Sequence, residues 1–104
     1  MPFSAAIWRY RATVADSITR IVGDLLARLR ATPQDTGWSS SYPNGDALVR
    51  DVEKLSGLIE QGDADADRTL RLLFAPTGAL QETAMSSGWS DDYMRLAGRL
   101  DAIV

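Results

Sequence analysis

Apolar residues recur at helical spacing between residues 14 and 31, and this stripe limits the possible fold more than any other feature of the chain. The segment reads VADSITRIVGDLLARLRA. Its apolar positions return every three or four residues over about five turns, which is the pattern of a helix with one buried face. Thr13 is a suitable N-cap, with Asp16 three residues further on. Pro33 predicts the end of the helix near residue 31.

The segment before this stripe allows two interpretations. If Ser4 caps a helix that continues into the stripe, Ile7 and Trp8 join the apolar face, but Arg11 falls within it. The alternation of apolar residues from Trp8 onward would instead suit a strand. A single strand has no partner for its hydrogen bonds, and the rest of the chain shows no second strand pattern. We therefore favour a helix with a break or kink near Arg11.

Four further helices follow from apolar spacing and from capping residues. Asn44 or Asp46 can cap the first of them, and Gly62 suits the left-handed residue after its end. Thr77 and Ser90 are the N-caps that we assign to the last two. The complete set of predicted helices is 4–31, 46–61, 65–74, 78–87 and 91–103. The connections are short, so the sequence predicts an all-α bundle of about five helices and a single domain over residues 1–104.

Two similar hexapeptides, GWSSSY at 37–42 and GWSDDY at 88–93, stand before predicted helices. In the second copy, the pattern makes Gly88 the end of one helix, Trp89 the residue before the next N-cap, and Ser90 that N-cap. Met94 is then placed to pack against Trp89. We interpret the repeat as capping chemistry rather than as a duplicated binding motif, and a decayed duplication stays open. The structural capping residues that this assigns are Gly37, Trp38, Ser39, Gly88, Trp89 and Ser90.

The chain contains no His and no Cys, and these absences remove most common catalytic and metal-binding chemistry. The run GDADAD at 62–67 resembles the start of a calcium loop, but Arg68 and Phe74 occupy the positions that need a glycine and a bidentate acid. The single Lys54 has no recognisable nucleophile motif beside it. We expect no enzymatic activity, no catalytic residues, no cofactor and no metal site.

Charge is distributed unevenly along the chain. Residues 1–31 hold five Arg against two Asp, a net charge of +3, whereas residues 32–104 have a net charge of −6. The acidic part disfavours nucleic acid, whose phosphates attract clustered basic residues. No apolar run approaches the roughly 18 residues of a membrane span, so we expect no membrane association, and the cytoplasm is the default compartment.

These observations favour a non-enzymatic protein–protein interaction module. Trp8, Arg9, Tyr10 and Arg11 are the candidate interaction residues, because aromatic and Arg side chains are common at binding hot spots. A toxin-neutralising immunity protein or a regulatory adaptor would fit, with a homodimer through this segment as a variant. One alternative is a small-molecule-binding helical domain with a pocket between its helices. Another is weak nucleic-acid binding through the Arg-rich first helix.

Overall fold

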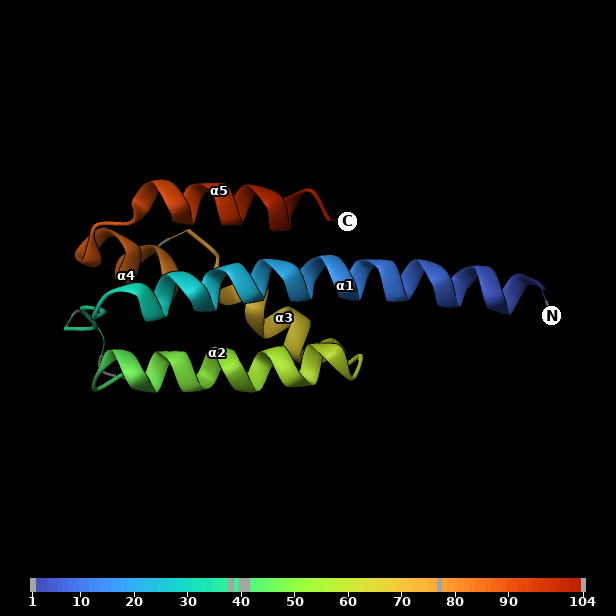
Figure 1. Ribbon diagram of the computed structural model, residues 1–104, viewed down its shortest axis with the longest axis horizontal. Coiled ribbons are helices and arrows are strands. Elements are labelled where there is room, and N and C mark those ends of the chain that lie inside the picture. The colour runs from blue at the N-terminus through green and yellow to red at the C-terminus, as the bar shows by residue number, and fades with distance from the viewer. Residues whose placement is uncertain (1, 38, 40–41, 77, 104) are drawn as a thin grey trace.

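The computed structural model describes residues 2–37, 39, 42–76 and 78–103, and within the first helix it describes side chains at residue 14 and from residue 16 on. All regular secondary structure in this part of the chain is α-helix, which confirms the predicted all-α bundle (Figure 1). Each helix begins and ends within two residues of its predicted bounds. The five helices are α1 (Pro2–Ala31), α2 (Gly45–Glu60), α3 (Ala64–Leu73), α4 (Ala79–Ser87) and α5 (Ser90–Asp101).

Helix α1 runs without interruption through the position where we expected a break. Arg11 and Thr13 both lie in its interior, so Thr13 is not an N-cap. The physical reason is that helix formation is costly to start but inexpensive to extend, since each added residue contributes a hydrogen bond. The segment between Pro2 and Gly23 contains neither Pro nor Gly, the two residues that most often interrupt a helix.

The helices pack mainly against their neighbours in the chain, and α1 completes the bundle. Helix α2 lies along α1, α3 connects α2 to α4, and α5 returns to pack on α1 (Figure 1). Every helix contributes to one apolar core. Its largest fully buried apolar side chains are Val22, Leu25, Leu48, Val52, Leu70, Leu80 and Leu100. Each buried Leu of this kind contributes roughly 1.5–3 kcal/mol to folding.

The residues that cap α2, α3 and α4 can be compared with the caps that the sequence predicts. Asn44 is the N-cap of α2, and its side chain accepts a hydrogen bond from the Ala47 backbone N–H at 3.0 Å. Gly62 follows α2 with a φ of 82°, as expected. Asp63 caps α3. The N-cap of α4 is Gly78 rather than Thr77, which lies outside the described residues.

The N-terminal part of α1 extends past the ends of α2 and α5 (Figure 1). We call residues 2–13 the projecting segment. The first described side chain of α1 that packs against the core is Val14. The projecting segment makes the molecule elongated, with extents of 52 × 23 × 22 Å. No described helix combines the length and the apolar character that crossing a bilayer requires.

Candidate functional site

The corner between α4 and α5 is built on the second hexapeptide. Gly88 ends α4 in the left-handed conformation, with φ at 84°, and its N–H donates to the carbonyl oxygen of Ala84 at 2.9 Å. Trp89 follows and is 2% exposed, so its ring is part of the core. The corner therefore directs a large apolar side chain inward at the point where the chain reverses.

The beginning of α5 differs by one residue from our expectation. Ser90 is the first residue of α5, and the N-cap position belongs to Trp89, whose carbonyl oxygen accepts from the Tyr93 N–H at 3.0 Å. The fourth residue of the helix, which packs against the residue before the N-cap in a hydrophobic staple, is then Tyr93 rather than Met94. Tyr93 is buried, whereas Met94, which we expected against Trp89, is 66% exposed.

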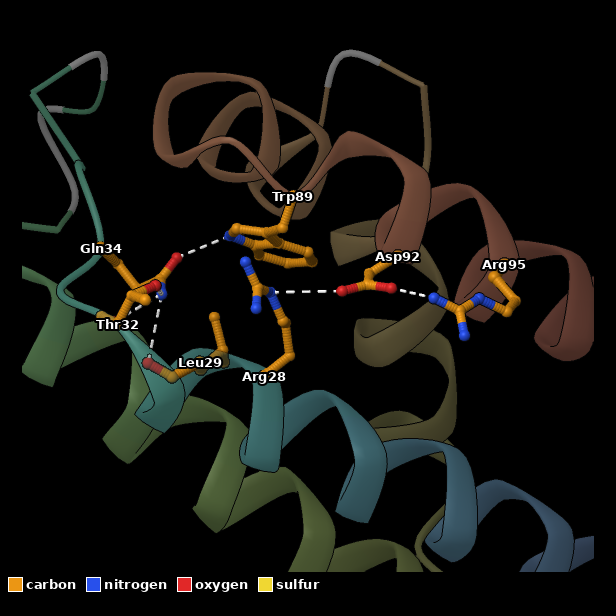
Figure 2. A network of polar contacts seen from close by, with 7 residues as sticks. All are labelled: Arg28, Leu29, Thr32, Gln34, Trp89, Asp92 and Arg95. Carbon is orange, nitrogen blue, oxygen red and sulfur yellow. Dashed lines mark hydrogen bonds and ion pairs between the residues drawn. The ribbon is translucent and has the colours of Figure 1, made fainter.

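Trp89 is also the centre of a polar network that joins this corner to the end of α1 (Figure 2). Its indole Nε1 donates to Gln34 Oε1 at 2.7 Å. The Gln34 amide nitrogen in turn donates to the carbonyl oxygens of Leu29 at 3.2 Å and Thr32 at 2.7 Å. Gln34 thus satisfies the free carbonyl groups at the end of α1 and the buried indole at the same time.

Arg28 joins the network over the Trp89 ring. Its guanidinium carbon lies 6.0 Å from the centre of the Trp89 ring, within the range of a cation–π contact. Its Nε is 3.4 Å from Asp92 Oδ2, too long for a well-formed hydrogen bond, and Asp92 also accepts from Arg95. We call Arg28, Gln34, Trp89 and Asp92 the latch. The polar groups of the latch contact one another, Arg95 and the end of α1, which is the geometry of a structural joint.

The first hexapeptide forms a different local structure. Gly37 lies in the connection between α1 and α2 and does not have the positive φ of Gly88. Ser39 Oγ accepts from the Tyr42 N–H at 3.2 Å, the hydrogen bond of an N-cap serine, although Asn44 is the residue that caps α2. Trp38 lies outside the described residues. Gly37, which we assigned as a capping residue, therefore ends no helix, because α1 ends at Ala31 and α2 begins at Gly45.

The two hexapeptides nevertheless meet at one end of the bundle. The Asp35 N–H donates to Ser87 Oγ at 2.9 Å, and the Gly37 N–H donates to Asp35 Oδ1, also at 2.9 Å. These contacts place the beginning of the first copy beside the residue that precedes the second. The arrangement fixes the α1–α2 connection onto the α4–α5 corner.

The candidate interaction residues Trp8, Arg9, Tyr10 and Arg11 all lie on the projecting segment. The structure places them on successive positions of α1, beyond the helices that cover the rest of α1 (Figure 1). Their side chains lie outside the described part of the chain. The structure gives these four residues a helical backbone, in agreement with the helix that we favoured over a strand.

A groove of about 430 Å³ lies between the end of α3 and α5 and brings Arg71, Tyr93 and Asp101 together. Two of these groups are already engaged within the protein. The Tyr93 hydroxyl donates to the Phe74 carbonyl oxygen at 2.6 Å, and Arg71 donates to Asp67 and to the Ile103 carbonyl oxygen at 3.3 Å. Burial raises the pKa of Tyr93, and the charge of Asp101 raises it further. The groove thus presents few free polar groups to a ligand.

The acidic run at 62–67 has a structural role. Asp63 Oδ1 accepts from the backbone N–H groups of Asp65 and Ala66, and the side chains of Asp65 and Asp67 pair with arginines one turn further along α3. In the part of the chain that the structure describes, no three acidic side chains gather as a metal site would require. The acidic side chains that resemble a calcium loop in the sequence therefore cap α3 and form ion pairs with arginines along it.

Comparison of the chain with protein-family models, with curated protein sequences and with solved structures gave no match. The contacts that form the latch were missed by the sequence interpretation, which assigned Trp89 only to the corner before α5. Gln34 and Trp89 are 55 residues apart, and no local pattern connects them. The only available signal was the presence of a polar residue immediately after Pro33, which ends α1.

Proposed function

We propose that the chain is a non-enzymatic protein–protein interaction module that binds through the projecting segment. The observation that carries this proposal is the continuation of α1 past the helices that cover it (Figure 1). Most of the stability of a helix in a folded protein comes from packing of its apolar face, and α2 and α5 both end before the projecting segment (Figure 1). A partner that covers the projecting segment would supply that packing.

The composition of the projecting segment supports the same proposal. It contains Phe3, Ile7, Trp8 and Tyr10 together with two Arg residues. Aromatic residues and Arg are enriched in the energetically important centres of protein interfaces. An immunity protein that neutralises a toxin and a regulatory adaptor are both roles that such a segment could serve, and the cytoplasm is where we expect it to act.

The small-molecule alternative has less support. The groove beside α5 gathers an Arg, a Tyr and an Asp, but Arg71 and Tyr93 use their polar atoms within the protein. A binding pocket needs convergent polar groups that are free to orient a ligand. Nucleic-acid binding is likewise disfavoured, because the rest of the chain, residues 16–104, has nine basic against fourteen acidic residues.

The test is a capture experiment with matched baits. Wild-type protein, Trp8→Ala, Tyr10→Ala and a control with Leu72→Ala, an exposed apolar residue of α3, are immobilised and exposed to an extract of the source cells and to the purified protein itself. We expect a bound protein that the wild type and Leu72→Ala retain and the two aromatic variants lose, while circular dichroism shows equal helix content. If every bait captures the same proteins, the projecting segment is not a binding element and the proposal fails.

A further inference from the structure

The apolar residues of the projecting segment stand in the register of a helix–helix seam. Phe3, Ile7 and Tyr10 of this segment and Val14, which directly follows it, are spaced by four, three and four residues, the a/d spacing of a coiled coil. Ile18, Ile21 and Leu25, which are buried in the body, continue the same line. Because α1 is one uninterrupted helix, a single seam runs from the core into the projecting segment.

The other helices of the chain cover only the part of this seam that lies in the body. Helices α2 and α5 pack along α1, and both end before the projecting segment (Figure 1). A seam with a/d spacing is complementary to another helix that carries the same spacing. The projecting segment of a second copy has this spacing, has the same length, and is uncovered in the same way.

Charge disfavours an anionic membrane or a nucleic acid as the occupant. Residues 1–15 contain Arg9 and Arg11 and no acidic residue, whereas residues 16–104 have a net charge of −5. The end of the body from which α1 emerges carries Glu60, Asp63 and Asp101 near the ends of α2 and α5. An anionic membrane or a nucleic acid would attract the two arginines but repel the acidic body behind them.

Charge also selects the orientation of the pair. A parallel pair would place two bodies of net charge −5 side by side. An antiparallel pair places them at opposite ends and puts the four arginines between two acidic body ends. We propose that the projecting segments of two copies pair antiparallel through Phe3, Ile7 and Tyr10, so that position 7 of one chain faces position 10 of the other. This inference rests on the proposed function, and it names a second copy of the chain as the protein that the projecting segment binds.

The first experiment measures the solution mass of the wild-type protein by light scattering, at two concentrations and two salt levels. We expect twice the mass of one chain, with dissociation on dilution. Ile7→Asp should weaken the dimer at least about tenfold, because it places a carboxylate in an apolar seam. Ala12→Asp introduces the same charge away from the seam and should leave the dimer within about threefold of the wild type, as expected for a surface substitution.

Orientation is tested with single cysteines, since the chain has none of its own. A mixture of Ile7→Cys and Tyr10→Cys chains should form a disulfide-linked heterodimer under mild oxidation. Phe3→Cys alone should not link to itself, because positions 3 and 3′ would be about 16 Å apart along an antiparallel pair. Efficient linkage of Phe3→Cys to itself would overturn the antiparallel arrangement.

The outcomes separate this inference from the proposed function. A wild-type protein that stays monomeric at every concentration overturns self-pairing. The capture experiment then decides whether another protein binds the projecting segment. A monomer that instead sediments with vesicles of phosphatidylserine and phosphatidylcholine, and loses this property in Ile7→Asp but not in Ala12→Asp, would assign the seam to a lipid surface and overturn both.

Discussion

Thr83 is fully buried in α4, and its hydroxyl oxygen has no hydrogen-bond partner among the described residues. A buried hydroxyl without a partner costs the free energy of removing it from water, about 1–3 kcal/mol. Val has nearly the same shape and lacks the hydroxyl. We expect Thr83→Val to raise the free energy of unfolding by about 1 kcal/mol in urea denaturation. Thr83→Ala should lower it, because the lost methyl group leaves a cavity. A destabilised Thr83→Val would indicate a partner for the hydroxyl.

Tyr42 provides a prediction on pH at the same scale. The pKa of Tyr42 is raised from 10.0 to about 12, mostly by burial and further by the neighbouring Asp51, which accepts from the hydroxyl at 2.9 Å. The fold thus favours the neutral phenol. The stabilisation that depends on this group is complete below pH 10 and is lost as pH rises towards 12.

Asp51→Asn tests the electrostatic part of this shift. The substitution removes the carboxylate but not the burial, so the pKa of Tyr42 should fall part of the way towards 10.0. The measurement is the phenolate absorbance of each protein during alkaline titration, with a Tyr42→Phe variant subtracted to remove the other tyrosines. An unchanged titration curve in Asp51→Asn would mean that burial alone sets the pKa.

At the scale of the helix, Gly88 and Gly98 have different backbone conformations. Gly88 ends α4 with φ at 84°, whereas Gly98 lies within α5, and a Cβ at either position meets nothing within 4 Å. Since crowding is absent, only backbone conformation decides the effect of an added methyl group. Gly88→Ala should destabilise the protein by about 1 kcal/mol, and Gly98→Ala should stabilise it by up to about 1 kcal/mol. Thermal unfolding of the two variants, which carry the same chemical change, should therefore shift in opposite directions. Equal shifts would contradict the assigned corner.

The joint between α1 and the α4–α5 corner depends on Gln34. Gln34→Ala leaves the buried Trp89 indole without its acceptor, and the carbonyl oxygens at the end of α1 lose a donor. We expect a loss of about 1–2 kcal/mol in unfolding free energy. Gln61→Ala is the matched control, because Gln61 is exposed at the end of α2 and should change stability by less than about 0.5 kcal/mol. Similar losses in both variants would show that the network contributes nothing specific.

At the scale of the whole molecule, the body and the projecting segment should separate cleanly. Among the described side chains, the core begins at Val14, so deletion of residues 2–12 removes none of the described core residues. Thr13 would then stand at the start of α1, in the N-cap role that it lacks in the full chain. We expect the shortened protein to keep the cooperative unfolding of the full chain, with a midpoint within about 5 °C of it. That shift corresponds to roughly 1 kcal/mol for a domain of this size.

The same deletion should abolish self-association, which sedimentation velocity would detect. A shortened protein that loses cooperative unfolding would show that the projecting segment is part of the folding unit. A shortened protein that still dimerises would place the interface elsewhere on the body. The two readouts, stability and association, therefore test separate claims about α1.

Much of this architecture was predictable from residues that act locally. The apolar stripe of 14–31 and the caps at Asn44 and Gly62 depend on neighbours within a few positions, and the sequence contains all of that information. The continuity of α1 was harder to predict from the sequence. Arg11 within the stripe suggested a break, but the energy of helix extension is collective and is decided over many residues.

The sequence by itself determined the helical class, the approximate bounds of each helix and the absence of His and Cys chemistry. The tertiary structure alone decided the latch, because Gln34, Arg28 and Trp89 come together only when α5 returns to α1. It alone decided that Gly37 and Gly88 form different structures despite their shared hexapeptide, and that α1 extends beyond its covering helices. Helix and capping preferences depend on residues within a few positions of one another, so the sequence reveals them. Contacts between residues 50 or more positions apart depend on tertiary packing, which no local pattern encodes.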